Sequence, residues 1–128
     1  MSISRQNLSI VIVTYKSEMV IHDCIGSIEK DIKIIVVENS DNSQFKEELE
    51  TTYTNVSCIL TSKNLGMGAG NNIGIKNAKT DFVLILNPDV ILEVSTINEL
   101  IIASQKILNF GILAPISSDT NYPNYKLL

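Results

Sequence analysis

The fold of this chain is indicated most clearly by two neighbouring motifs, Asn64-Leu65-Gly66-Met67-Gly68-Ala69-Gly70-Asn71-Asn72-Ile73-Gly74 and Leu84-Ile85-Leu86-Asn87-Pro88-Asp89. We predict that the first motif is a glycine-rich loop that opens a helix. The second is predicted to be an apolar strand that ends at Asn-Pro-Asp. In open α/β sheets, ligands bind in the crevice at the carboxyl ends of the strands. Asp89 therefore lies where a metal or phosphate contact is expected.

These motifs belong to a chain in which predicted strands and helices alternate. Apolar, β-branched stretches predict buried strands over residues 8–13, 32–37, 56–60, 82–86 and 112–114. Apolar residues with helical spacing, together with capping residues such as Ser17, predict helices over residues 17–30, 43–52, 68–78 and 95–108. This order predicts an α/β fold with a Rossmann-like, mainly parallel sheet of about five strands and helices on both faces.

Size and charge restrict the classes of function. The 128 residues are enough for a single domain over residues 1–128, and 45% hydrophobic with 19% charged residues is an ordinary globular balance. The net charge is −4 and there is no basic run, which argues against a nucleic-acid partner. The longest apolar runs have strand length, so no transmembrane segment is predicted. Residues 1–7 lack the apolar block of a signal peptide, and we expect a cytoplasmic protein.

The chain has two cysteines, Cys24 and Cys58. Each lies among apolar neighbours, the first in a predicted helix and the second in a predicted strand. Reduced thiols in a cytosolic protein are commonly buried and behave as small apolar groups. We therefore predict two buried, reduced thiols and neither a disulfide nor a metal site formed by the pair.

Polar residues follow three of the predicted strands directly: Thr14-Tyr15, Glu38-Asn39-Ser40 and Asn87-Pro88-Asp89. In a parallel sheet, all carboxyl ends emerge at the same edge. We therefore expect the three clusters to converge there, beside the start of the glycine-rich helix. Convergence of this kind is typical of a ligand-binding edge.

Each cluster also has a purely structural interpretation. The glycines could serve only tight turns and close packing, because position 71 is Asn71 where a dinucleotide-binding fingerprint requires glycine, and no P-loop lysine follows. Asn87-Pro88-Asp89 could simply be a turn that ends a strand. Glu38 could cap a turn, or it could accept hydrogen bonds from a base or a ribose. Thr14 and Tyr15 could pack at the strand end, or they could form the floor under a flat heterocycle.

Taken in order, the motifs resemble the N-terminal half of family 2 glycosyltransferases, inverting enzymes of the GT-A fold, and in particular their rhamnosyltransferase-like bacterial branch. The resemblance covers about residues 8–115. It rests on Ile10-Val11-Ile12-Val13-Thr14-Tyr15, Cys24-Ile25-x-Ser27-Ile28, Ile35-Val36-Val37-Glu38-Asn39-Ser40, Asn64-x-Gly66 through Asn72-x-Gly74, and Leu86-Asn87-Pro88-Asp89. Glu38 stands where that family usually has aspartate. The last motif is similar to this branch's form of the D-x-D metal motif.

The resemblance implies a nucleotide-diphospho-sugar donor and a divalent cation, Mg²⁺ or Mn²⁺. The donor-binding residues that it implies are Thr14, Tyr15, Glu38, Asn39, Asn64, Gly66, Asn71 and Asn87. Among them, Thr14, Tyr15 and Glu38 would line the nucleoside pocket. Asn64, Gly66 and Asn71 would lie near the donor sugar and diphosphate. Asn87 would contact the ribose or the metal shell, and Asp89 would bind the metal.

The implied reaction is displacement at the anomeric carbon by an acceptor hydroxyl, with inversion, in bacterial polysaccharide or glycan synthesis. The acceptor would be a glycan or a lipid-linked glycan at the inner face of the membrane. The general base of this reaction is expected beyond Leu128, in an acceptor-binding half that this sequence does not contain. Asp119 follows Glu99 as the last carboxylate side chain, and it comes too early to match that base. No catalytic residue is therefore identified.

Two other functions remain open from the sequence. The chain could be a non-catalytic nucleotide-sugar-binding or regulatory module left by truncation. Such a module could form a homo-oligomer through the apolar surface that the loss of a half leaves exposed. It could also be an unrelated doubly wound domain of the receiver or flavodoxin type. The receiver alternative is disfavoured because the first predicted strand ends in Thr14-Tyr15 and not in an acidic pair.

Overall fold

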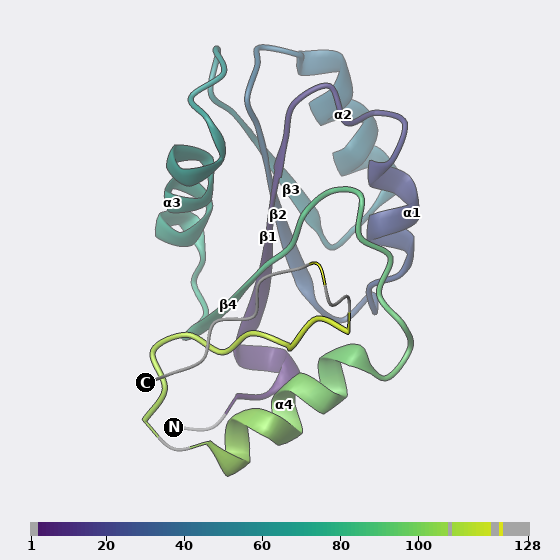
Figure 1. The fold of residues 1–128 in the computed structure, drawn as a ribbon. Helices are drawn as coiled ribbons and strands as arrows, with labels where there is room; N and C mark the ends of the chain where they lie inside the picture. The colour runs from purple at the N-terminus through teal and green to yellow at the C-terminus, as the bar shows by residue number, and fades with distance from the viewer. Residues whose placement is uncertain (1–2, 108, 119–120, 122–128) are drawn as a thin grey trace.

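A parallel sheet forms the centre of the molecule. The structure is a computed structural model that describes residues 3–107, 109–118 and 121 (Figure 1). Within these residues the sheet has four strands in the order β3-β2-β1-β4. Their bounds are β1 (Leu8–Thr14), β2 (Lys33–Glu38), β3 (Val56–Leu60) and β4 (Phe82–Ile85). All strand pairs are parallel, which confirms the predicted α/β fold with a parallel sheet.

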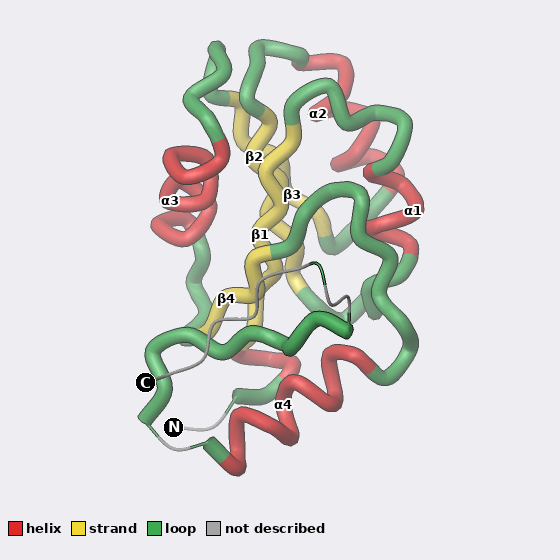
Figure 2. The backbone as a smooth tube through the Cα atoms, viewed as in Figure 1, coloured by secondary structure: helices red, strands yellow, loops and turns green. Residues whose placement is uncertain are grey.

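Helices cover both faces of this sheet (Figures 1 and 2). Their bounds are α1 (Ile21–Gly26), α2 (Ser43–Thr52), α3 (Met67–Asn77) and α4 (Thr96–Lys106), and a short 3₁₀ turn, η1 (Arg5–Asn7), precedes β1. Helix α3 packs on one face. Helices α1 and α2 pack on the other, and Ile97 of α4 belongs to the same core cluster as they do.

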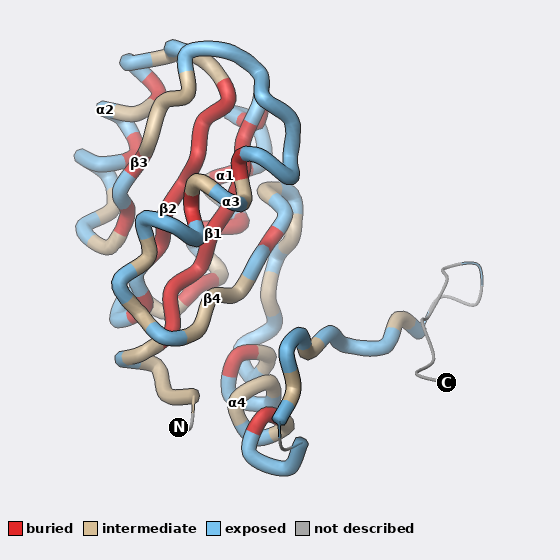
Figure 3. Tube along the Cα trace, turned by 90° about the vertical axis from the view of Figure 1, so that its left-hand side faces the viewer, coloured by how far each residue is buried: buried red, intermediate tan, exposed pale blue. Residues whose placement is uncertain are grey.

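The alternation of side chains along β1 explains this layering. All seven residues of β1 are buried (Figure 3). Val11 and Val13 join the core cluster on the α3 face, whereas Ile10 and Ile12 join the larger cluster under α1 and α2. Because successive side chains of a strand point to opposite faces, a strand buried on both faces is mainly apolar. This accounts for the apolar run from Ile10 to Val13, while the buried hydroxyls of Ser9 and Thr14 are hydrogen-bonded to Thr80 and Glu38.

The strand register places the candidate residues at one edge. Thr14, the last residue of β1, pairs with Glu38, the last residue of β2. Strand β4 ends earlier than β1, since its last residue, Ile85, pairs with Val11 and not with the end of β1. One more bond follows, from the Leu86 amide to the Val11 carbonyl, and the chain then leaves the sheet toward α1. The tips of β1 and β2 therefore extend beyond β4.

Two predicted elements differ from the structure. The fifth strand predicted over 112–114 is wrong, since this segment is irregular and Ile112 is 91% exposed. A strand needs a hydrogen-bonded neighbour, which an apolar pattern does not supply by itself. The helix predicted over 17–30 is shorter. Residues 18–20 form a turn in which the Ser17 carbonyl accepts the amides of Val20 and Ile21, and α1 begins only at Ile21.

No helix in the described part of the chain has the length and apolar character that crossing a bilayer would require.

Candidate functional site

A buried carboxylate joins the ends of β1 and β2. Glu38 is only 2% exposed. The hydroxyl of Thr14 donates to its Oε1 atom at 2.9 Å, and the hydroxyl of Ser40 donates to its Oε2 atom at 2.7 Å. Each oxygen of this buried side chain thus has a hydroxyl donor. Glu38 therefore holds two polar side chains in place at the edge of the sheet.

A second buried side chain, Asn39, connects three segments. It is 1% exposed, and its amide nitrogen donates to the Gly66 carbonyl at 2.9 Å. Its amide oxygen accepts the Thr61 hydroxyl at 3.0 Å, and its backbone amide donates to the Thr14 carbonyl at 2.8 Å. Asn39 thereby ties together the ends of β1 and β3 and the loop before α3.

The loop before α3 has a conformation that favours glycine. Gly66 has a φ of +86°, which side chains with a Cβ rarely adopt. Its backbone amide donates to the Asn64 side-chain oxygen at 3.0 Å. Gly66 is the N-cap residue of α3, and no side chain caps this helix start. The first amides of a helix have no partner within the helix, and together with the helix dipole they favour an anion. Asn71 lies half-buried further along α3.

Two glycines bring α3 unusually close to β1. A Cβ atom at Gly70 would lie 2.8 Å from Cγ1 of Val13 and 3.4 Å from Nδ2 of Asn39. A Cβ atom at Gly74 would lie 2.3 Å from Cγ1 of Val11. Glycines spaced by four residues share one face of a helix. The structural interpretation of these glycines is therefore correct for Gly70 and Gly74, and it is compatible with a ligand role for the loop at Gly66.

Tyr15 is the exposed aromatic residue at this edge. Its side chain is 46% exposed, and the Lys16 ammonium lies 5.3 Å from its ring centroid. The backbone of Tyr15 is held by Ser17, whose hydroxyl oxygen accepts the Tyr15 amide at 3.2 Å and whose hydroxyl donates to the Tyr15 carbonyl at 3.3 Å. An exposed ring of this kind offers a surface on which a flat heterocycle can stack.

The Asn87-Pro88-Asp89 segment lies next to α1. The Asn87 carbonyl accepts the Cys24 thiol at 3.6 Å and the Val90 amide at 3.2 Å, while the side chains of Asn87 and Asp89 are exposed. Burial raises the pKa of the Cys24 thiol to about 11, and the nearby negative charge of Asp89 adds to this rise. Asp89 therefore lies near Cys24 of α1, with its carboxylate open to solvent.

The residues suited to a metal are few. Among the described residues, no group of three histidine, cysteine, aspartate or glutamate side chains could hold a metal ion by itself. Mg²⁺ is commonly bound by one or two carboxylates together with substrate phosphates. The exposed Asp89 carboxylate fits a Mg²⁺ site in which substrate phosphates supply most of the oxygens. It does not fit a metal site made of protein side chains alone.

Both cysteines are buried and free, as the sequence predicts. Burial is the main cause that raises the pKa of each thiol to about 11. We expect both thiols to react very slowly with a disulfide reagent near pH 8, because the thiolate is the reactive form. Labelling should become fast for both only in denaturant. Rapid labelling of either thiol in the native protein would contradict this burial.

The same shifts predict a stability change at high pH. A thiol whose pKa is higher in the folded state stabilises the fold at pH values below its unfolded pKa, near 9, and this contribution is lost as pH rises toward about 11.

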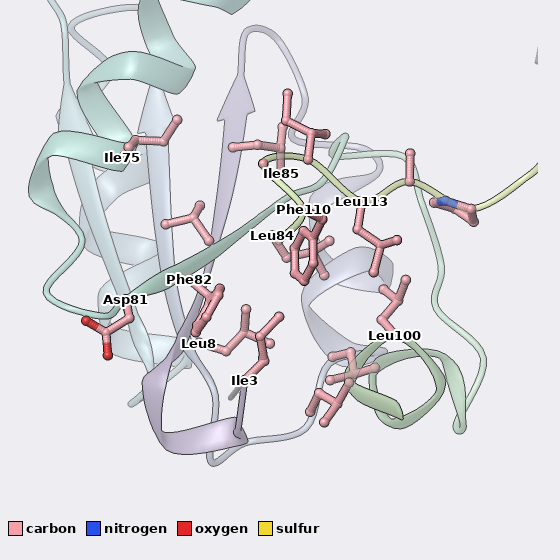
Figure 4. Close-up of a pocket in the computed structure, with 17 residues that line it drawn as sticks. Ile3, Leu8, Ile75, Asp81, Phe82, Leu84, Ile85, Leu100, Phe110 and Leu113 are labelled. Atoms are coloured by element: carbon pink, nitrogen blue, oxygen red, sulfur yellow. The ribbon is translucent and has the colours of Figure 1, made fainter. Parts of the chain in front are cut away.

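A cavity of about 600 Å³ lies away from these residues, beside β4 (Figure 4). Its lining is almost entirely apolar, from η1's neighbours Ile3 and Leu8, from β4, from α4 and from residues 110–115. Asp81 is the charged side chain among the lining residues. An apolar cavity with one carboxylate is unsuited to a diphosphate. The polar edge at the tips of β1 and β2 is therefore the better candidate site.

The structure brings most of the predicted site residues together. Direct hydrogen bonds link Thr14 with Glu38, Asn39 with Gly66, and Gly66 with Asn64. The bonds of Asn87 lead instead toward α1. Thr61, which the sequence analysis missed, directly follows β3. The rule that picked out polar residues after the other strands would have found it. Asp119 lies outside the described residues.

Comparison with known proteins decides the family. Residues 9–116 match the family described as Glycosyl transferase family 2. The chain belongs to glycosyl transferase family 2. The family predicted from the motifs is thereby confirmed.

A curated relative of this family member is the low-salt glycan biosynthesis hexosyltransferase Agl10 of Haloferax volcanii. It is 33% identical over 113 residues, which are 85% of this chain and 36% of that protein. Among solved structures, S. aureus TarS 1–349 in complex with UDP matches with a TM-score of 0.63 at 18% identity, over 84% of this chain and 38% of that chain. S. aureus TarS 1–349 also matches with a TM-score of 0.61 at 23% identity, over 73% of this chain and 31% of that chain. This family member thus spans about a third of the length of these relatives.

Proposed function

We propose that this chain is the donor-binding part of a glycosyltransferase that transfers a sugar from a nucleotide-diphospho-sugar to an acceptor hydroxyl with inversion. The observation that supports this most is the hydrogen-bonded edge formed by Thr14, Glu38, Asn39 and Gly66 in a chain of family 2. In an open parallel sheet this edge is where a nucleotide binds. The whole of residues 1–128 would form this one domain.

The nucleoside would bind at the tips of β1 and β2. Tyr15 offers its exposed ring to the base. Thr14 and Glu38 would line the pocket below the base. Because the hydroxyls of Thr14 and Ser40 already donate to the two oxygens of Glu38, the main role of Glu38 would be to hold these side chains in place. A carboxylate has further acceptor positions, so Glu38 could still accept a hydrogen bond from the base or ribose.

The diphosphate would bind at the start of α3. The loop from Asn64 to Gly66 presents this helix start, with Asn71 behind it. The net charge of −4 leaves no general attraction for an anion, so local amides and a cation must supply it. UDP is the ligand named for the solved TarS complex, and it is a suitable first probe for this chain.

Asp89 would share Mg²⁺ or Mn²⁺ with the diphosphate, and Asn87 would contact the ribose or the metal shell. When bound, such a cation neutralises the charge that develops on the leaving diphosphate. The chain's own residues would hold and orient the donor. The acceptor, by analogy with the glycan named for Agl10, would be a glycan or a lipid-linked glycan, and the general base would come from outside the described residues.

Titration calorimetry of UDP, dTDP and GDP, each with and without Mn²⁺, tests this proposal. We expect one nucleotide to bind in a metal-dependent way. In Asp89→Ala its affinity should fall by about tenfold or more, because the cation loses its protein carboxylate. Asp81→Ala is the matched control, since Asp81 is an exposed carboxylate beside the apolar cavity and should leave binding unchanged.

The outcomes separate the alternatives. Absence of binding for all three nucleotides would overturn the proposed donor site. Binding that does not depend on Mn²⁺ and is equal in Asp89→Ala would keep the donor site but remove the metal role of Asp89. Nucleotide-sugar binding without any transfer to supplied acceptors would favour the non-catalytic binding module.

A further inference from the structure

We infer that Asn39 and Thr61 are positioning residues, which hold the glycine-rich loop so that the start of α3 receives the β-phosphate of the donor. This inference rests on the proposed function and deepens it. It assigns to Asn39 a role different from the direct donor contact that the family resemblance implies, and it adds Thr61 to the site.

The burial of Asn39 is the first step of the argument. A side chain that is 1% exposed presents almost no surface to a ligand. Both ends of its amide are used within the protein, the nitrogen by the Gly66 carbonyl and the oxygen by the Thr61 hydroxyl. Asn39 can therefore influence a donor only through the segments that it holds.

The Gly66 carbonyl is the second step. It accepts the Asn39 side chain at 2.9 Å, and it also accepts the Gly70 amide at 3.1 Å, which is the first hydrogen bond of α3. The same oxygen thus links β2 to the helix start. Gly66 itself has a φ of +86°, one of several conformations open to a glycine backbone, so local preference alone does not fix it. Asn39 supplies a tertiary restraint on that conformation.

Thr61 is the third step. If the Asn39 amide were reversed, its oxygen would face the Gly66 carbonyl oxygen at 2.9 Å, which is repulsive. In the observed orientation the amide oxygen faces Thr61 and can be satisfied only by a donor. The Thr61 hydroxyl lies 3.0 Å from it, and the Lys63 carbonyl at 2.8 Å and the Glu38 carbonyl at 3.3 Å compete for the same proton. The Gly66 carbonyl thus sets the orientation of the Asn39 amide, and Thr61 supplies a hydroxyl donor to the amide oxygen in that orientation.

Affinity for UDP relative to UMP, measured by calorimetry with Mn²⁺, tests the inference. The two ligands differ by the β-phosphate, and the matching pair of dTDP or GDP replaces them if that nucleotide binds. In Asn39→Ala we expect the ratio of the UMP to the UDP dissociation constant to fall about fivefold, the equivalent of one lost hydrogen bond in the anion site. UMP affinity itself should change little.

The Thr61 variants provide the matched controls. Thr61→Val keeps the shape and removes the hydroxyl, so the ratio should fall about threefold. Thr61→Ser keeps the hydroxyl and should retain the wild-type ratio of the UMP to the UDP dissociation constant. Thermal unfolding of each variant establishes that it is folded. If Asn39→Ala does not fold, the pair Thr61→Val and Thr61→Ser decides the question, because Asn39 is intact in both.

Different failures identify different errors. A wild-type chain that binds no nucleotide overturns the proposed function and this inference with it. Wild-type binding of UDP together with an unchanged ratio in Asn39→Ala and Thr61→Val overturns this inference alone. Equal weakening of UMP and UDP also overturns it, because a general loss of structure would weaken both ligands alike.

Discussion

Gly74→Ala should lower the free energy of unfolding by about 1–3 kcal/mol, the usual cost of forcing an extra carbon into a packed core. The added Cβ would lie 2.3 Å from Cγ1 and 3.0 Å from Cγ2 of Val11. Val11 is fully buried in the central strand β1, so neither it nor the strand can move aside easily. Helix α3 would have to shift away from the sheet. Urea denaturation followed by circular dichroism measures the change.

Gly68→Ala is the matched control on the same helix. A Cβ atom at Gly68 would meet nothing within 4 Å. Alanine favours a helix over glycine by about 1 kcal/mol, so this variant should be slightly more stable than the wild type. The two substitutions are chemically identical and should have opposite signs. If Gly74→Ala were as stable as Gly68→Ala, the close approach of α3 to β1 would be wrong.

A double variant sharpens this result. Val11→Ala makes room at the contact, so its cost and the cost of Gly74→Ala should not add. The double variant Val11→Ala/Gly74→Ala is expected to be about 1 kcal/mol more stable than the sum of the single changes indicates, as is typical of residues in contact.

Thr14→Val should also be strongly destabilising, by about 1–3 kcal/mol. The substitution keeps the shape of the side chain but removes the hydroxyl that donates to Glu38 at 2.9 Å. Glu38 is 2% exposed, so water cannot easily replace the lost donor. A buried carboxylate with one partner fewer destabilises the folded state. Thermal or urea unfolding gives the magnitude.

Thr52→Val is the control for this prediction. Thr52 is exposed at the end of α2, and surface substitutions of this kind usually change stability by less than about 0.5 kcal/mol. Equal, small effects of Thr14→Val and Thr52→Val would show that the hydroxyl of Thr14 contributes little to holding Glu38.

Much of the fold was predictable because it depends on local patterns. The strand over 56–60 and the helix over 43–52 coincide with β3 and α2. The pairing of Thr14 with Glu38 follows from the parallel order of two buried strands. The fifth strand over 112–114 was wrong because a strand exists only with a neighbour to pair with. The start of α1 was wrong because a turn at 18–20 replaces its first helical turn.

The sequence by itself determined the order of the elements, the parallel sheet, the family and the edge at which the polar residues gather. The elements and the sheet follow from periodicities within short segments, because burial on one or both faces imposes a repeat on neighbouring residues, whereas the family follows from the resemblance of the motifs. Only the tertiary structure decided which polar side chains are buried and what they hold. Asn39 is a link between β3 and α3 because Thr61 and Gly66 meet it in space. Contacts between residues far apart in the sequence leave no local repeat, and therefore they appear only when the chain is folded.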